Sequence, residues 1–177
     1  NTVTSGCRNC ISQGKSLTKS PQADFLKPYK FKVSKNILVC DDSDFFHPQA
    51  DEWRNEAWIT IKANPKHRWF ITTKYPHRIH KCLPADWESG YANVYLGISA
   101  ERQNILNVRA MKLLENKAKG RYLVIEPLLE LVSVHDFLTV EIRKQKIKPF
   151  DLVFVGGETA IENSNKKDRN CSQEWIE

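Results

Sequence analysis

The chain has 177 residues, of which 41% are hydrophobic and 10% aromatic, and its formal net charge is +6 at pH 7. This composition excludes an intrinsically disordered protein, and the length allows one domain with a sizeable core. No apolar run reaches the roughly 18 residues of a membrane-spanning helix, so we expect no membrane contact.

The N-terminal stretch "SGCRNC" places Cys7 and Cys10 three positions apart. The chain has five scattered cysteines, an odd number that disfavours a secreted disulfide framework and indicates a reducing compartment, the cytoplasm. In such a compartment, a close cysteine pair indicates metal binding or thiol redox chemistry. Two thiolates do not complete a metal site, so the other ligands remain to be found.

Residues 1–40 contain the whole excess of positive charge. They hold seven Lys or Arg and one acidic residue, a balance of +6, whereas the rest of the chain holds 20 basic and 20 acidic residues. Such a segment attracts polyanions, above all nucleic acid, although a solvated lysine-rich loop has the same composition. We expect a single domain, 1–177, in which residues 1–35 form an irregular basic arm, and we expect residues to be missing at both ends.

Beyond this arm, apolar runs alternate with amphipathic segments. The pattern predicts strands at 36–40, 67–74, 93–99, 121–127 and 150–158. It predicts helices at 50–64, 101–120 and, with less regular spacing, 133–148. Strands that alternate with helices form βαβ units, so the expected fold is α/β, either doubly wound or a partial or complete parallel (β/α) barrel.

Each of the five predicted strands is followed by polar or charged residues. The carboxyl ends of parallel strands meet at one edge of a sheet, where ligands bind in such folds. We therefore expect one pocket there, surrounded by Asp41, Asp42, Ser43, Asp44, Lys74, Ser99, Glu101, Glu126 and Glu158. Taken singly, each of these residues has a structural alternative as a helix cap, a turn residue or a surface residue.

Arg109 lies about two helical turns after Ser99 and Glu101. A carboxylate accepts hydrogen bonds from an ammonium group, and a guanidinium binds a carboxylate through two parallel hydrogen bonds. Together, these groups suit a zwitterionic amino-acid moiety. The alternative is an ordinary salt bridge on the surface of the helix.

Seven strings occur in one order along the chain: "SGCRNC", "DDSDFFH", "DEWRNEAW", "FITTKYPHRI", "NVYLGISAERQ", "IEPLLE" and "VFVGGE". They resemble a family of bacterial and phage proteins with a three-cysteine motif, usually described only as phage-related proteins of unknown function. That family resembles the radical S-adenosylmethionine (radical SAM) enzymes. The resemblance covers residues 5–177 and implies a TIM-type (β/α) barrel of the radical SAM kind.

The resemblance also implies cofactors and roles. In the family motif Cys-x6-Cys-x2-Cys, Cys7 and Cys10 match the second and third cysteines, and the first falls one position before Asn1. These thiolates would hold a 4Fe-4S cluster that cleaves S-adenosylmethionine to a 5′-deoxyadenosyl radical. The implied cofactor-binding residues are Asp42, Ser43, Asp44, Ser99, Glu101 and Arg109. The implied catalytic residues are Lys74, Glu126 and Glu158.

Two functional hypotheses stay open beside a radical SAM enzyme that acts on a nucleic acid or nucleotide. One is a non-catalytic (β/α) scaffold that binds nucleic acid or zinc, with His77 and His80 as the nearest histidine pair. The other is a thiol redox protein that uses Cys7 and Cys10, although the loop-like segment after Cys10 disfavours it. All three are compatible with a protein partner.

Overall fold

In the computed structural model of the chain, the described residues are 7–8, 16–41, 43–138, 140–142 and 145–157. Five parallel strands form one curled sheet in the order β3-β4-β5-β6-β9. These strands are β3 (Asn36–Val39), β4 (Arg68–Thr73), β5 (Val94–Ala100), β6 (Gly120–Ile125) and β9 (Leu152–Val155). The strands lie in chain order, so the sheet forms half of a barrel and has no reversal of strand order. The α/β class and the parallel sheet are thus confirmed.

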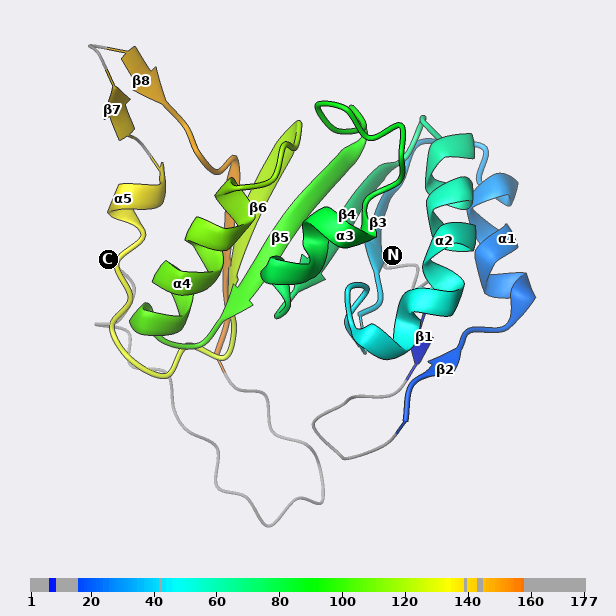
Figure 1. Cartoon of the computed structure of the whole chain (residues 1–177), viewed down its shortest axis with the longest axis horizontal. Helices are drawn as coiled ribbons and strands as arrows, with labels where there is room; N and C mark the ends of the chain where they lie inside the picture. The colour runs from blue at the N-terminus through cyan, green and yellow to red at the C-terminus, as the bar shows by residue number, and fades with distance from the viewer. Residues whose placement is uncertain (1–6, 9–15, 42, 139, 143–144, 158–177) are drawn as a thin grey trace.

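The helices that connect consecutive strands lie on one face of this sheet. They are α2 (Asp51–Ala63), the short α3 (Ile79–Cys82) and α4 (Gln103–Leu114), all in front of the sheet in Figure 1. Crossovers between parallel strands are right-handed, so strands in chain order bring every crossover to the same side. Among the described residues, no crossover helix lies on the opposite face of the sheet.

The core lies between this helix layer and the sheet. Trp69, Leu96 and Leu123 point from neighbouring strands toward the helices and are fully buried. Helix α2 contributes Trp58 and Ile61 to the same core. Acidic residues begin α2 and a lysine occupies its last turn, an order that complements the helix dipole.

Residues 16–35 belong to the arm 1–35 that was expected to be irregular, but the structure shows regular elements in this part. It contains β2 (Thr18–Lys19) and the nine-residue helix α1 (Gln22–Lys30), which packs beside α2. The lysine-rich pattern conceals this helix because Phe25, 2% exposed, provides much of its apolar contact. The imidazole of His67 adds a hydrogen bond of 2.9 Å between Nε2 and the carbonyl oxygen of Pro28.

The structure also differs from two further predictions. Helix α4 ends at Leu114, and Gly120 begins β6 instead of ending the helix. The segment 133–148 was predicted to be helical, but it holds one short helix, α5 (His135–Leu138), and a hairpin of β7 (Val140–Ile142) and β8 (Gln145–Ile147). The β-branched residues of the hairpin favour extended structure over helix.

A second small sheet lies near the start of α2, which follows the end of β3. Strand β1 (Cys7–Arg8) pairs antiparallel with β2. The backbone N–H of Leu17 donates to Oε1 of Gln49, in the 3-10 helix η2 (Pro48–Ala50), at 3.1 Å. Figure 1 shows β1 and β2 at the end of the main sheet where its strands terminate. Among the described helices, none is both long and apolar enough to cross a bilayer.

Candidate functional site

A cluster of three charged side chains lies at the carboxyl ends of β4 and β5. Lys74, just after β4, places Nζ 2.8 Å from Oε1 of Glu101, just after β5. Arg109, on α4, places Nη1 3.6 Å from the other carboxylate oxygen of Glu101 and donates a 2.5 Å hydrogen bond to the carbonyl oxygen of Ser99. The structure therefore brings together four of the residues that the sequence indicated.

Glu101 is the centre of this cluster. Burial alone would raise the pKa of its carboxyl group, but the hydrogen bond from Lys74 and the charges of Lys74 and Arg109 outweigh burial and lower the pKa. Glu101 is therefore ionised near neutral pH between two cations. The cluster carries a net charge of about +1. It offers one carboxylate to an ammonium group and two cations to a carboxylate, so it suits a ligand that carries both groups.

Asp44, after β3, has a different arrangement. Its Oδ1 accepts hydrogen bonds from the Phe46 N–H at 2.9 Å and the Thr73 hydroxyl at 2.7 Å, and Oδ2 accepts from the Lys74 N–H at 2.7 Å. Asp44 is 6% exposed, and burial raises the pKa of its carboxyl group although these hydrogen bonds and His47 oppose the rise. The carboxylate thus fixes the backbone at Lys74.

Two arginines hold the loop that carries Asp44. Arg54 donates to the carbonyl oxygens of Phe45 at 2.9 Å and His47 at 3.0 Å. Arg78 donates to the carbonyl oxygen of Phe46, between them, at 2.8 Å. Three successive carbonyl groups are therefore bound by guanidinium groups. This explains why "SDFFH" and "KYPHR" occur together: the second motif supplies an arginine that fixes the first.

Glu126, exposed after β6, lies beside the end of β9. A Cβ atom at Gly156 would lie 3.1 Å from Cδ of Glu126, so the glycine allows this close approach. The backbone there is paired, since the Leu128 N–H donates to the Gly156 carbonyl oxygen at 2.9 Å and the Leu129 N–H donates to the Glu101 carbonyl oxygen at 3.2 Å. Within the described residues, no hydrogen bond or ion pair joins the Glu126 side chain to the charged cluster.

Several residues that the sequence predicted for the site are not among those described above. Cys10, Asp42 and Glu158 are outside the described residues, and only the backbone of Cys7 is described. Ser43 follows β3, and its N–H donates to the Cys40 carbonyl oxygen at 3.1 Å. Among the described side chains, no group of three His, Cys, Asp or Glu residues is arranged to hold a metal ion.

The face of the sheet opposite the helices carries aromatic residues that sequence reasoning did not assign to a site. Phe70 and Tyr95 stack with ring centroids 4.9 Å apart, and Phe70 and Phe154 each contact Tyr122 edge-on. The Tyr122 hydroxyl lies 2.7 Å from the Thr72 hydroxyl. The sequence signal for these aromatic residues was the alternation in "RWFITT" and "GRYLVI". Large residues occur on both faces of these strands, so the strands resembled strands buried on both sides.

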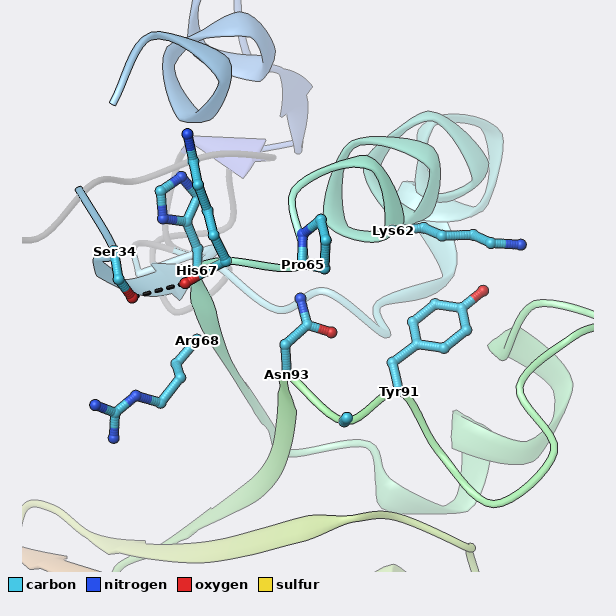
Figure 2. A pocket seen from close by; sticks show the side chains of 9 residues that line it. Ser34, Lys62, Pro65, His67, Arg68, Tyr91 and Asn93 are labelled. Atoms are coloured by element: carbon cyan, nitrogen blue, oxygen red, sulfur yellow. Dashed lines mark hydrogen bonds between the residues drawn. The ribbon is translucent and has the colours of Figure 1, made fainter. Parts of the chain in front are cut away.

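A pocket of about 440 Å³ lies at the opposite edge of the sheet, where the strands begin. It lies between the last turn of α2 and the starts of β4 and β5, and Figure 2 shows Lys62 and Arg68 pointing away from each other at its margins. Ser34 donates a 2.6 Å hydrogen bond to the Lys66 carbonyl oxygen at its wall. None of the predicted site residues lines this pocket.

The comparisons with known proteins give one match. The sequence model of a family described as "Protein of unknown function (DUF5131)" matches residues 1–177. No curated protein and no solved structure matches the chain significantly.

Proposed function

The chain belongs to the DUF5131 family, whose description states no function, and we propose that it is an iron–sulfur enzyme of the radical SAM type. The observation that carries this proposal is the cluster of Lys74, Glu101 and Arg109 at the carboxyl ends of a half-barrel sheet. In parallel α/β folds, this edge is where ligands bind.

The charges of the cluster support an amino-acid moiety as the ligand. Glu101 accepts from an ammonium group, and Arg109 and Lys74 donate to a carboxylate. In the structure Glu101 pairs with both cations, which leaves one positive charge in excess. A zwitterion exchanges those ion pairs for new ones, so binding leaves none of the three charges without a partner. S-Adenosylmethionine carries such a moiety.

The donor chemistry of Cys7 and Cys10 fits an iron–sulfur cluster. Thiolates are the usual ligands of such clusters, and a third ligand from outside the described residues would be needed. Cys40 and Cys82 are buried in the core and offer no alternative pair. A bound cluster would supply the electron that cleaves the sulfonium of S-adenosylmethionine.

The remaining predicted residues take positioning and substrate roles in this proposal. Asp44 acts through Lys74, because it fixes the backbone from which the lysine side chain extends. Ser43 follows the end of the same strand, β3, and Asp42 precedes it in the sequence. Glu126 lies beside Gly156 and would face the substrate, a nucleic acid or nucleotide. Glu158 follows the two glycines in the sequence, and we propose a catalytic role for it on the resemblance alone.

Anaerobic reconstitution with iron and sulfide tests the cofactor. We expect a broad absorbance near ~400 nm, lost in Cys7→Ser and Cys10→Ser and kept in the control Cys82→Ser. Under reduction, the reconstituted protein should form 5′-deoxyadenosine from S-adenosylmethionine. Colourless protein that retains one zinc ion per chain would contradict the proposal and favour the non-catalytic scaffold.

A further inference from the structure

The face of the sheet opposite the helices, hereafter the open face, carries aromatic rings that reach across to neighbouring strands. Tyr95 pairs with Gly120, and Tyr122 pairs with Gly97. A Cβ atom at either glycine would overlap the ring of its partner, so each glycine makes room for a ring on the sheet surface. The two glycines therefore make room for an aromatic surface on this face, in which the Phe70 and Tyr95 rings stack and the Tyr122 ring is inclined by 73° to Phe70.

Part of this surface is exposed. Phe154, on the edge strand β9, is 49% exposed and contacts Tyr122 with ring centroids 5.9 Å apart. Phe70 and Tyr95 are half-buried, so their stacked rings remain partly accessible. Exposed, rigidly supported rings of this kind bind planar groups by stacking.

A basic region adjoins the open face where β3 and β4 begin. The two chain segments of this region carry Lys30, Lys32 and Lys35 before β3 and Lys66 and Arg68 at the start of β4, and none of these five forms an ion pair with an acidic side chain among the described residues. The two segments lie side by side, since the Arg68 N–H donates to the Lys35 carbonyl oxygen at 2.9 Å and Lys66 Nζ donates to the Phe31 carbonyl oxygen at 2.6 Å. Negative charge from another molecule can therefore pair with these five cations.

Arg68 connects the basic region to the aromatic surface. It lies two residues before Phe70 on β4, so both side chains are on the open face. It is exposed, and its guanidinium has no hydrogen-bonding or ionic partner among the described residues. Figure 2 shows its side chain extending away from Lys62 on α2.

We propose that the open face and this basic region bind single-stranded nucleic acid. Bases stack on Phe70, Tyr95 and Phe154, and phosphates contact Arg68 and its neighbouring lysines. A single strand fits because its bases expose their faces, whereas a duplex buries them against one another. A second copy of this chain fits poorly, because it would bring the same unneutralised cations into contact.

The surface leads to the charged cluster. Strand β4 runs from Arg68 to Thr73, and Lys74 follows it, so one strand spans the distance from the basic region to the cluster. Binding of nucleic acid at this surface needs neither an iron–sulfur cluster nor S-adenosylmethionine. The proposal thus stands apart from the proposed function, and its test is made with the protein as purified.

Fluorescence anisotropy with a labelled 12-nucleotide oligothymidine tests the proposal, with an abasic strand of equal length as the probe for phosphate contacts alone. The wild-type protein should bind the oligothymidine at least about 10-fold more tightly than the abasic strand. Phe154→Ala should weaken oligothymidine binding about 5- to 10-fold and leave abasic binding unchanged. Phe154→Tyr should restore affinity, and Val155→Ala, on the same strand but the other face, should have no effect.

Arg68→Gln tests the phosphate contacts. It should weaken binding of both probes equally and reduce the slope of log affinity against log salt by about 1. The control Lys112→Gln removes one positive charge from the exposed surface of α4 and should leave both quantities unchanged. Equal affinity of the wild-type protein for both probes would overturn the proposal. So would a concentration-dependent dimer that Phe154→Ala abolishes, because the open face would then bind a second copy.

Discussion

The Asp44 carboxylate accepts a 2.7 Å hydrogen bond from the backbone N–H of Lys74, and this bond joins the ends of β3 and β4. The same carboxylate binds the Thr73 hydroxyl and the Phe46 N–H. One buried acidic side chain thus holds three polar groups in a fixed position. Lys74 reaches Glu101 from a backbone that Asp44 has already oriented.

Asp44→Asn should lower the free energy of unfolding by about 1–3 kcal/mol, measured by urea denaturation. An amide has one acceptor oxygen instead of two, so its NH2 group would face a backbone N–H or the Thr73 hydroxyl. Asp136→Asn, at an exposed position, is the matched control and should change stability little. An unchanged stability in Asp44→Asn would show that the three donors find other acceptors.

Glu101→Gln tests the charge of the cluster through its pH dependence. The folded-state pKa of Glu101 is lowered from its ordinary value of 4.5, so its contribution to stability is present above pH 4.5 and lost as the pH falls through the folded-state value. At pH 7 the variant should be less stable by about 1 kcal/mol or less, because Lys74 is half exposed. The difference should shrink as the pH falls below 4.5 and Glu101 becomes protonated in the folded state. A difference that stayed constant over this fall in pH would indicate lost packing instead of lost charge.

Gly97→Ala should destabilise the protein by about 1–3 kcal/mol, because the new methyl group overlaps the Tyr122 ring. Displacing the ring also separates the Tyr122 and Thr72 hydroxyls. Gly156→Ala is the control, since its Cβ atom meets only the flexible end of Glu126 at 3.1 Å. Thermal unfolding followed by near-ultraviolet circular dichroism measures both effects, and equal melting temperatures would show that the ring moves without cost.

Lys74→Met and Arg109→Met test the amino-acid site of the proposed function. Each should weaken binding of S-adenosylhomocysteine to the reconstituted protein about 10-fold or more, because a charged hydrogen bond is lost. Isothermal titration calorimetry measures this affinity. Lys112→Met, on the exposed surface of α4, should bind as the wild-type protein does. If all three variants bound equally well, the cluster would have no part in cofactor binding.

The edge of the sheet that holds the charged cluster was predictable because parallel strands end on one side. That rule places Asp44, Lys74 and Glu101 at one edge without knowledge of any contact. It does not say which donors occupy each carboxylate. The Asp44 carboxylate accepts hydrogen bonds from backbone N–H groups and a hydroxyl, whereas the Glu101 carboxylate binds two cations. This difference depends on loop geometry that no local sequence pattern encodes.

The missed elements have tertiary causes. The lysine-rich helix α1 is stabilised by the burial of Phe25 and by the hydrogen bond between His67 and Pro28, which lie far apart in sequence. The aromatic surface was missed because large residues on both faces of a strand predict burial on both sides. Only the strand order, which directs the crossover helices to one face, reveals that no described helix covers the other face.

The strand order also has a consequence for synthesis of the chain. Each of β4, β5 and β6 pairs with the strand made just before it, so its template is already present when it emerges. Pairing between close neighbours in sequence lowers the entropy lost on loop closure and favours rapid folding. Strand β9 alone must wait for the hairpin of β7 and β8 to be made first, so we infer that the half-barrel is assembled from its β3 edge and that β9 joins last.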